Sequence, residues 1–465
     1  MDTTTVTEYQ EAIQRLDSFM NFERNPAALS AGGFGTERMA NLMRRIGSPH
    51  LTMPAVHIAG TKGKGSTAHL VAAALTASKI MVGLYTSPHV NDLRERIVIG
   101  RRPVNERRFA LAARTALKAA EDMRADGHEP SYFEVLTAIA FQFFHNAGVE
   151  VVVLEAGLGG RLDATNLPDL PVLATGISSI SRDHEDILGA DLPLIAAEKA
   201  GIIRRNVPVA TSVTEPGALD VIIKTAAAME SPLFRVGEDV RFSRRENRQP
   251  PPRPERGQRI DFETWRALYP DVSLGLLGDH QAENAALALA LVELFMDGSS
   301  RGPLDGGALR SGWRNLAIPA RMEILGGRPR LVVDGGHNPS AAWAVAEAVA
   351  GVFPAERRVL VFGSAADKDS RTMLRILAPL FDRIVFSAYD SPRAKTATEL
   401  MAELAELGRG DKGTAAESPA RALELARGLV PDDGLILAFG SFYLAGEVRS
   451  AALAAERDSP GKPVP

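Results

Sequence analysis

The sequence predicts an α/β protein of two domains, each built on a mostly parallel sheet. Apolar runs bounded by glycine or proline alternate with longer segments of helical periodicity, which is the pattern of strands joined by crossover helices. At 465 residues the chain exceeds what one hydrophobic core usually serves, and a hydrophobic content of 45% is ample for two. A third observation is the glycine-rich turn at residues 60–66, which lies between an expected strand and an expected helix.

The apolar runs and the helix-like segments place the expected elements along the chain. Strands are expected at residues 55–59, 82–85, 149–155, 172–177, 207–211, 330–333, 359–363, 383–387 and 434–438. Helices are expected at residues 66–78, 133–146, 192–200, 281–297, 340–350 and 420–428.

Two segments interrupt this alternation. Residues 298–316 are rich in glycine and serine and precede a new set of strands, so we expect them to separate a domain over residues 1–300 from a smaller one over residues 317–465. Residues 244–259 are rich in arginine and proline and offer nothing to bury. We expect a solvated loop or an insertion there.

Composition excludes several classes of function. A net charge of −4 gives no overall electrostatic reason to bind nucleic acid or an anionic membrane. The absence of cysteine excludes disulfides, thiolate nucleophiles and Cys-ligated zinc. The first residues lack the features of a signal peptide, and no apolar run is long enough to span a bilayer. We therefore expect a cytoplasmic protein, and a monomer because no dimerisation stripe is evident.

The stretch "HIAGTKGKGS" indicates a phosphate-binding loop. Its glycines follow a strand and precede a helix, where free amides and the helix N-terminus attract anions. The strict pattern G-x-x-x-x-G-K-[ST] fails, because Ile58 replaces its first glycine and Gly65 replaces its hydroxyl residue. In the shorter variant the backbone at Gly60 and Gly63 approaches phosphate oxygens, and Lys64 lies against the β/γ charge. The predicted nucleotide-binding residues here are Gly60, Thr61, Gly63, Lys64, Gly65 and Ser66.

Other polar side chains stand at the ends of expected strands or helices, and each has a structural alternative. Glu155 ends an apolar strand and is placed to bind magnesium, or it pairs with Arg161 or is solvated. Lys199 stands near the end of a helix, where a cation stabilises the C-terminus. Asp334 ends a strand in the second domain, and a cap or turn role is an equal alternative. Phe133 is an ordinary candidate for the core.

The order of the motifs resembles the Mur ligase superfamily and, within it, the folylpolyglutamate synthase/dihydrofolate synthase family. The motifs that carry the resemblance are "EYQEAIQRL", "FGTERMANLMRRIGSPH", "HIAGTKGKGS", "GLYTSPHV", "SYFEVLTAIAF", "VVVLEAGLGGRLDATN", "DHEDILGADLPLIAAEKAGIIR", "LLGDHQAENAALALAL", "PARMEIL", "LVVDGGHNP", "DKD" and "GSFYLAGEVR". One departure is Lys62, which stands where the family usually has asparagine. The resemblance implies a Mur-ligase-like phosphate-loop domain followed by a smaller Rossmann-like α/β domain.

The resemblance also implies roles for individual residues. The positions that match magnesium ligands are Ser87, Glu155 and His184. Lys199 matches a lysine that is carbamylated by CO2 and then binds a second magnesium ion, which requires its neutral amine. The implied pterin-side substrate site comprises Phe133, Gly160, Arg161, Leu162 and Asp163. The implied nucleotide contacts outside the phosphate-binding loop are Asn284, Arg321 and Asp334, with His337 beside them. The catalytic set is then Lys64, His184, Lys199, Asp334 and His337.

The predicted activity is the ATP-dependent coupling of a pteroate or folate carboxylate to L-glutamate through an acyl phosphate. The expected substrates are dihydropteroate or a reduced folate, ATP and glutamate, with two magnesium ions. The sequence leaves open whether the product is dihydrofolate, folylpolyglutamate or both. The alternatives are a cell-wall Mur-type enzyme acting on a UDP-sugar, and a nucleotide switch that is not a ligase.

Overall fold

The structure, a computed structural model, describes residues 3–22, 35–181, 191–245, 257–326, 328–353 and 357–457. The chain divides into two compact units. The first unit comprises Met1–Ser243, Asp261–Val272 and Glu283–Trp313, and the second comprises Arg244–Ile260, Ser273–Ala282 and Arg314–Pro465. The division after Trp313 falls inside the region 298–316, but two earlier segments also belong to the second unit.

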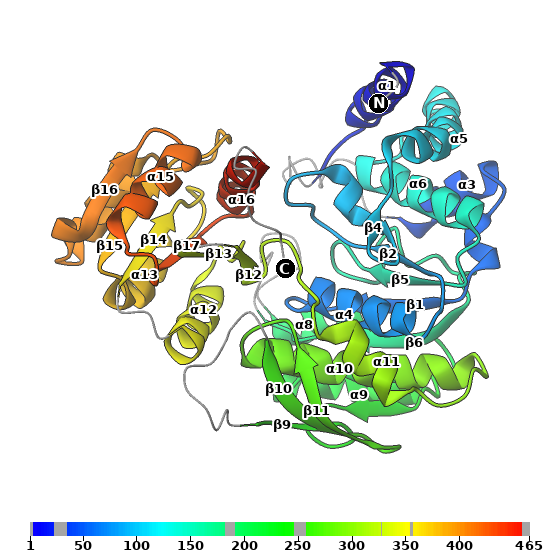
Figure 1. Ribbon diagram of the computed structural model, residues 1–465. Coiled ribbons are helices and arrows are strands. Elements are labelled where there is room, and N and C mark those ends of the chain that lie inside the picture. The colour runs from blue at the N-terminus through cyan, green and yellow to red at the C-terminus, as the bar shows by residue number, and fades with distance from the viewer. Residues whose placement is uncertain are drawn as a thin grey trace. The chain divides into compact units, whose positions relative to one another are not determined.

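The first unit is built on a sheet whose described strands follow the order β4-β3-β2-β5-β1-β6-β7-β8. Figure 1 labels β4, β2, β5, β1 and β6 of this sheet. Strands β2 to β8 in that order run parallel, while β3 and β4 continue the sheet in antiparallel fashion. The central strands are buried along their whole length, as expected for a parallel sheet covered on both faces. The strands are β1 Ala55–Ala59, β2 Val82–Tyr85, β3 Ile97–Ile99, β4 Arg102–Pro103, β5 Val151–Glu155, β6 Val172–Ile177, β7 Val209–Thr211 and β8 Leu233–Arg235.

Helices cover both faces of this sheet. Figure 1 shows α1, α3, α5 and α6 on one side and α4, α10 and α11 on the other. The larger core cluster lies between the first group and the sheet. The helices are α1 Thr3–Asp17, α3 Thr36–Arg45, α4 Lys64–Ala77, α5 Glu106–Ala125, α6 Tyr132–Ala147, α8 Leu192–Ala200, α9 Pro216–Ala228, α10 Asp279–Gly298 and α11 Gly306–Trp313. Single 3-10 turns occur at Pro49–Thr52, Leu93–Arg96, Ala378–Leu380 and Gly410–Lys412.

Local signals explain where several elements begin. Ser131 and Glu134 form a reciprocal capping box at the start of α6, and Gly148 in a left-handed conformation caps its end. Because the backbone N–H of Val149 still bonds to Phe144 O in that cap, β5 begins at Val151 and not at residue 149 as predicted. The strand predicted at residues 207–211 likewise begins later, at Val209, after a proline.

The second unit has its own sheet, in the order β12-β13-β17-β14-β15-β16. Only β12 is antiparallel to its neighbour. Its strands are β12 Glu323–Leu325, β13 Arg330–Val333, β14 Arg358–Phe362, β15 Arg383–Ser387, β16 Gly413–Ala416 and β17 Leu435–Phe439. Its helices are α12 Pro339–Val352, α13 Ser370–Leu377, α14 Ala397–Glu406, α15 Pro419–Leu429 and α16 Phe442–Arg457. The α/β fold class with mostly parallel sheets is confirmed.

A further small sheet, in the order β11-β10-β9, was not predicted. Its strands, β9 Arg241–Arg244, β10 Gln258–Glu263 and β11 Leu268–Leu274, are divided between the two units. The prediction of a solvated loop over residues 244–259 is wrong at both of its ends, which lie in β9 and β10. Gln258 is buried because its amide donates to the carbonyls of Leu276 and Gly278. The rest, residues 246–256, lies outside the described residues.

Among the described helices, none combines the length and the apolar character that crossing a membrane requires.

Candidate active site

The phosphate-binding loop, residues 60–66, connects β1 to α4. Gly63 has a φ of +86°, which favours glycine, and a Cβ atom there would collide with the amide of Asn284. A Cβ on Gly60 would collide with Ser178, which follows β6. Helix α4 begins at Lys64, two residues before the predicted start, so Ser66 lies within its first turn and is buried.

Lys64 is held by the backbone of its own loop, whereas Lys62 is bridged to the segment after β6. Lys64 Nζ donates to the carbonyl oxygens of Gly60, at 3.1 Å, and Thr61, at 3.2 Å. This places the ammonium group at the loop, as the phosphate-binding prediction requires. Lys62, the departure from the family pattern, is half-buried and forms an isolated bridge with Ser179.

The segment after β6 supports the loop, and the sequence prediction missed it. Thr61 N donates to Ser179 O at 2.8 Å, and the Thr61 hydroxyl donates to Ser181 O at 3.2 Å. The available signal was a pair of serines directly after a predicted strand, because neighbouring parallel strands end at the same edge of a sheet. His184, three residues further on, lies outside the described residues.

Glu155 lies at the same edge, at the end of β5. Its side chain is buried, and Oε2 accepts a hydrogen bond from Ser87 N at 3.0 Å. The carboxylate also lies against the first turn of α4, where a Cβ on Gly65 would be 3.1 Å from Oε2. The alternative pairing with Arg161 does not occur, since Arg161 binds Glu198 at 2.8 Å. The structure therefore brings Ser87, Glu155 and the phosphate-binding loop together.

Lys199 reaches the loop from the end of α8. It is buried, and its Nζ donates to Gly60 O at 2.9 Å. Gly160 packs against the same helix end, where a Cβ would be 2.8 Å from Glu198 O and 3.1 Å from Lys199 Cα. A fully buried ammonium group is costly unless it is hydrogen-bonded, so this lysine is held in place by its contact with the loop.

The oxygen donors of this edge suit a hard cation. The carboxylate of Glu155 and the hydroxyl of Ser87 are ligands of the kind that Mg²⁺ accepts together with water and phosphate. Lys199 does not fit as a ligand while it is an ammonium group. Within the described ranges, no cluster of three or more His, Asp or Glu side chains is arranged to hold a metal by itself.

The glycine loop, residues 157–166, follows Glu155 directly. Phe133, at the start of α6, packs so closely on Gly157 that a Cβ there would be 2.6 Å from the ring. The side chain of Arg161 is exposed, and Leu162 is half-buried. Phe133, Arg161 and Leu162 thus lie on or beside the loop that the resemblance assigns to the pterin side.

Asp163 differs from that expectation, because its carboxylate faces the inside of the loop. It is buried and accepts from Leu158 N at 2.9 Å, from Thr165 N at 2.9 Å and from the Thr165 hydroxyl at 2.6 Å. Burial raises the pKa of its carboxyl group, and these hydrogen bonds oppose that rise. In this position the carboxylate of Asp163 holds the loop's shape.

A second cluster lies in the second unit, at the ends of β13 and β17. Asp334 is buried and accepts from Met322 N at 2.9 Å and from Gly336 N, two residues later, at 2.7 Å. It therefore has the alternative turn role but is not the cap of α12, which is Asn338. Burial raises the pKa of Asp334, and the nearby charge of Arg321 opposes the rise. Arg321 stacks on Phe442 with its guanidinium carbon 5.0 Å from the ring centre.

His337 completes this cluster. Its Nδ1 lies 3.1 Å from Gly335 O, and its ring centre lies 5.9 Å from that of Phe442. The structure thus brings Arg321, Asp334 and His337 together, as predicted from separate motifs. The "DKD" loop is more ordinary, since Asp367 pairs with Lys368 at 3.2 Å and Asp369 caps α13.

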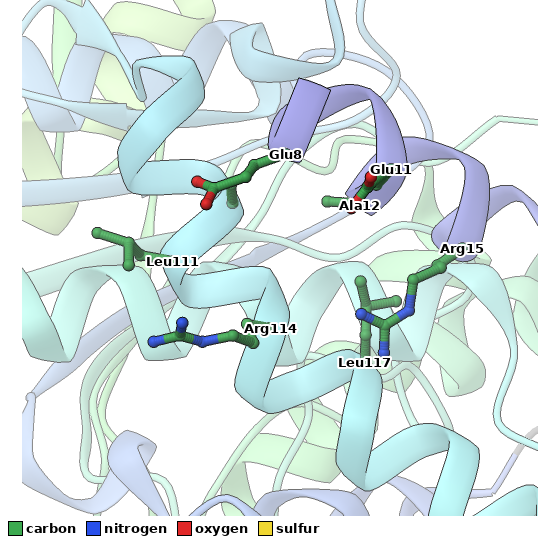
Figure 2. A pocket seen from close by; sticks show the side chains of 8 residues that line it. Glu8, Glu11, Ala12, Arg15, Leu111, Arg114 and Leu117 are labelled. Atoms are coloured by element: carbon green, nitrogen blue, oxygen red, sulfur yellow. The ribbon is translucent and has the colours of Figure 1, made fainter. Parts of the chain in front are cut away.

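Figure 2 shows a hollow elsewhere, between α1 and α5. Glu8, Glu11 and Arg15 line it from α1, and Leu111, Arg114 and Leu117 line it from α5. None of the predicted site residues lines this hollow.

The fold and these two clusters define a Mur ligase. Residues 58–292 match the Mur ligase middle domain, and residues 320–442 match the Mur ligase glutamate ligase domain. A dihydrofolate synthase/folylpolyglutamate synthase of Mycobacterium tuberculosis is 36% identical over 409 residues, which cover 85% of this chain and 82% of the relative. The chain belongs to the dihydrofolate synthase/folylpolyglutamate synthase family.

Solved structures agree with this assignment. The M. tuberculosis folylpolyglutamate synthase complexed with ADP has a TM-score of 0.85 and 32% identity, covering 96% of this chain and 99% of that one. E. coli FolC in complex with DHPP and ADP has a TM-score of 0.77 and 28% identity, covering 92% of this chain and 94% of that one.

Proposed function

We infer that this protein is an ATP-dependent ligase that joins L-glutamate to the carboxylate of dihydropteroate, of a folate, or of both. The observation that carries this inference is the meeting of the phosphate-binding loop, Glu155 and Lys199 at one sheet edge, in a chain of this family. Relatives are named for both activities, and solved relatives hold ADP with and without a second ligand.

The reaction requires activation of an acid. Forming an amide from a carboxylate and an amine is uphill, so the carboxylate oxygen first attacks the γ-phosphorus of ATP, giving an acyl phosphate and ADP. The amine of glutamate then attacks the acyl carbon and phosphate leaves. The loop amides and Lys64 would orient the γ-phosphoryl group, and positive charge there would stabilise the transfer.

The metal and the lysine complete this proposal. Ser87 and Glu155, with His184 predicted from sequence, would hold magnesium, and we propose two ions. Bound magnesium supplies charge neutralisation for the phosphates. Carbamylation of Lys199 would convert the ammonium group into a carboxylate-like group beside Gly60, which would suit it to a cation. The position of Lys199, buried and in contact with the phosphate-binding loop, supports this proposal.

The remaining residues are proposed to bind the substrates. Phe133 and the glycine loop, including Gly160, Arg161 and Leu162, would contact the pterin side of the acid. Asn284 lies against Gly63 and would contact ATP from α10. In the second unit Arg321, Asp334 and His337 would contact the nucleotide. On this proposal residues 1–300 carry the phosphate and pterin sites, and residues 317–465 contribute the second nucleotide cluster.

Phosphate release tests the function directly. The full-length protein is supplied with ATP, magnesium and L-glutamate, and dihydropteroate and tetrahydrofolate are offered separately. Phosphate release with dihydropteroate identifies a dihydrofolate synthase, release with tetrahydrofolate identifies a folylpolyglutamate synthase, and release with both identifies a bifunctional enzyme. Mass spectrometry should show the product with one more glutamate.

The same assay separates the alternatives. Turnover only with a UDP-sugar acid would identify a cell-wall Mur-type enzyme, and ATP hydrolysis independent of any acid and of glutamate would indicate a nucleotide switch. The Lys64→Met variant is the control for contaminating ATPase, since it should lose the glutamate-dependent release. We propose a monomer, which light scattering of the same sample would test.

A further inference from the structure

A buried polar chain links the strand that carries the phosphate-binding loop to the glycine loop. His57 lies in the middle of β1, between β5 and β6, and is fully buried. Its Nε2 lies 2.8 Å from the hydroxyl oxygen of Thr165, which is also fully buried. The two residues are 108 positions apart in the sequence, so this is a tertiary contact made by the fold.

The direction of the hydrogen bonds can be assigned. The hydroxyl of Thr165 donates its only proton to Asp163 Oδ1 at 2.6 Å, so toward His57 it acts as an acceptor. His57 must therefore carry its proton on Nε2. Its Nδ1 is buried and has no partner among the described residues, which suits a bare nitrogen better than a second N–H. Burial lowers the pKa of His57 to about 3, so the ring is neutral near neutral pH.

Asp163 carries this chain into the glycine loop. Its two oxygens accept from the backbone of Leu158 and Thr165, and the backbone of Gly157 also bonds to this carboxylate. A single carboxylate thus gathers donors from both ends of the loop. All of its partners are donors, so a carboxylate satisfies every one of these bonds.

The glycine loop contacts three parts of the proposed active site. Gly157 packs on the ring of Phe133, and Gly160 packs on the backbone of Lys199. Residue 156 joins the loop directly to Glu155. At the other end of the chain, β1 runs from His57 into Gly60, whose carbonyl accepts from Lys199. The loop and the phosphate-binding strand are therefore connected by two routes, one through Lys199 and one through His57.

We propose that His57, Thr165 and Asp163 form a positioning network that fixes the glycine loop relative to the phosphate-binding strand, so that the acid substrate is held in line with the γ-phosphoryl group. The proposal rests on the ligase function proposed above. None of the three residues contacts the reacting atoms. His57 acts as a fixed donor that keeps its Nε2 proton and transfers no proton during the reaction.

A purely structural role makes a different prediction. Removing a buried hydrogen bond would then lower stability and lower the amount of active enzyme, which reduces kcat for all substrates alike. A positioning role instead changes the placement of one substrate. It raises KM for the acid and slows the chemical step, while the nucleotide still binds to its own loop.

The test uses three Thr variants of the full-length protein. Thr165→Val keeps the side-chain shape and removes the hydroxyl, and Thr165→Ser keeps the hydroxyl. Thr175→Val is the matched control, because Thr175 lies in β6 directly opposite His57, is fully buried, and has a hydroxyl without a partner in the described structure. Steady-state kinetics are measured for the acid and for ATP, and ADP affinity is measured by calorimetry without the acid.

The expected result is a kcat/KM for the acid that falls by about 10²-fold in Thr165→Val, within the range that a small misplacement causes, with ADP affinity unchanged. Thr165→Ser should recover most of this loss, and Thr175→Val should match the wild type. The network would be overturned if Thr165→Val kept the wild-type kcat/KM for the acid. It would also be overturned if ADP affinity fell as much as kcat/KM for the acid, or if Thr165→Ser did not recover that kcat/KM. A wild type without acid-dependent turnover would instead refute the proposed function.

A spectroscopic measurement tests the network without turnover. Nitrogen-15 NMR of the histidine rings should show His57 as the neutral Nε2–H form between pH 6 and 8, and Thr165→Val should shift its signals. A protonated Nδ1 at His57 would reverse the direction of the hydrogen bonds and would refute the assignment.

Discussion

The Nζ atom of Lys199 lies 2.9 Å from the carbonyl oxygen of Gly60, so the end of α8 is hydrogen-bonded to the first residue of the phosphate-binding loop. The contact explains why a long cationic side chain is buried at a helix end. The helix C-terminus alone would have been satisfied by an exposed lysine in the last turn. The position of Lys199 is therefore set by the loop.

Replacing Lys199 by methionine should abolish most of the ligase activity and leave the fold intact. Methionine fills the same space without a buried charge, so the free energy of unfolding should change little. The proposed cation site loses a ligand, and kcat should fall by about 10²–10³-fold, as when one transition-state stabiliser is removed. Glutamate-dependent phosphate release measures kcat, and urea denaturation measures stability.

Lys224→Met is the matched control for this change. Lys224 is exposed on α9 and pairs with Asp220, one turn earlier, so its replacement should change activity and stability very little. Carbon-13 NMR with labelled bicarbonate should show a carbamate signal that Lys199→Met removes. Full turnover by Lys199→Met would refute its proposed role in the site.

Replacing Gly160 by alanine should damage both the fold and the activity. The new methyl group would lie 2.8 Å from Glu198 O and 3.1 Å from Lys199 Cα, which are backbone atoms that cannot rotate away. Overpacking of this kind costs about 1–3 kcal/mol, and it would push the end of α8 away from the phosphate-binding loop. Thermal unfolding and phosphate release should both detect the change.

Gly428→Ala controls for the loss of a glycine. A methyl group there meets open space near the end of α15, so helix propensity alone should stabilise the protein by up to about 1 kcal/mol. If the two alanine variants had the same unfolding temperature and the same rate of phosphate release, the contact of Gly160 with α8 would contribute nothing to stability or activity.

Local sequence patterns predicted several strands of the two sheets and the phosphate-binding loop. The strands at residues 55–59, 172–177, 330–333 and 383–387 have the predicted limits, because each is a largely apolar run of mostly buried residues. The phosphate-binding loop was predictable because its glycines stand between a strand and a helix. Since parallel strands end at one edge, Glu155 and the loop could be expected to meet.

Long-range partners were not predictable from the sequence. Nothing near Asp163 indicates that its carboxylate closes its own loop, and nothing near His57 points to Thr165, which is 108 residues away. Strands β9 to β11 were missed because their burial is partial and alternating, which gives a weak signal beside proline-rich residues. Gln258 was assigned to a solvated loop because its backbone partners lie in another segment.

The ion pair of Arg38 with Glu134 should stabilise the start of α6. Arg38 Nε lies 2.9 Å from Glu134 Oε2, and the Glu134 side chain is only 6% exposed and also accepts from Ser131 N. Arg38→Met leaves this carboxylate buried with one donor fewer, at a cost of about 2–4 kcal/mol. Because Phe133 directly precedes Glu134, KM for the acid should rise as well.

A double-mutant cycle isolates this pair. Glu134→Gln keeps an acceptor for Ser131 N and removes the charge, so Arg38→Met combined with Glu134→Gln should be more stable than the sum of the single losses predicts, by about 1–3 kcal/mol. The exposed pair Arg421 and Glu424 on α15 is the comparison, with an expected coupling below about 0.5 kcal/mol. Additive losses at Arg38 and Glu134 would mean that the two residues do not stabilise each other.

His280 should make the protein less stable in mild acid. Burial lowers its pKa from 6.5 to about 4, and the charge of Arg321 lowers it further, whereas Asp279 raises it. Between these two values the unfolded chain binds a proton that the folded chain does not. The free energy of unfolding therefore falls as the pH decreases from 6.5 toward 4, by up to about 1.4 kcal/mol per pH unit from this one residue.

His280→Gln isolates that contribution, because glutamine does not titrate. Other buried groups, such as Asp334 with its raised pKa, contribute with the opposite sign, so the difference between the two proteins is the quantity to measure. Urea denaturation at several pH values should give a steeper acid loss for the wild type than for His280→Gln, with parallel curves above pH 7. Parallel curves over the whole range would show that His280 has the same pKa in the folded and unfolded chains.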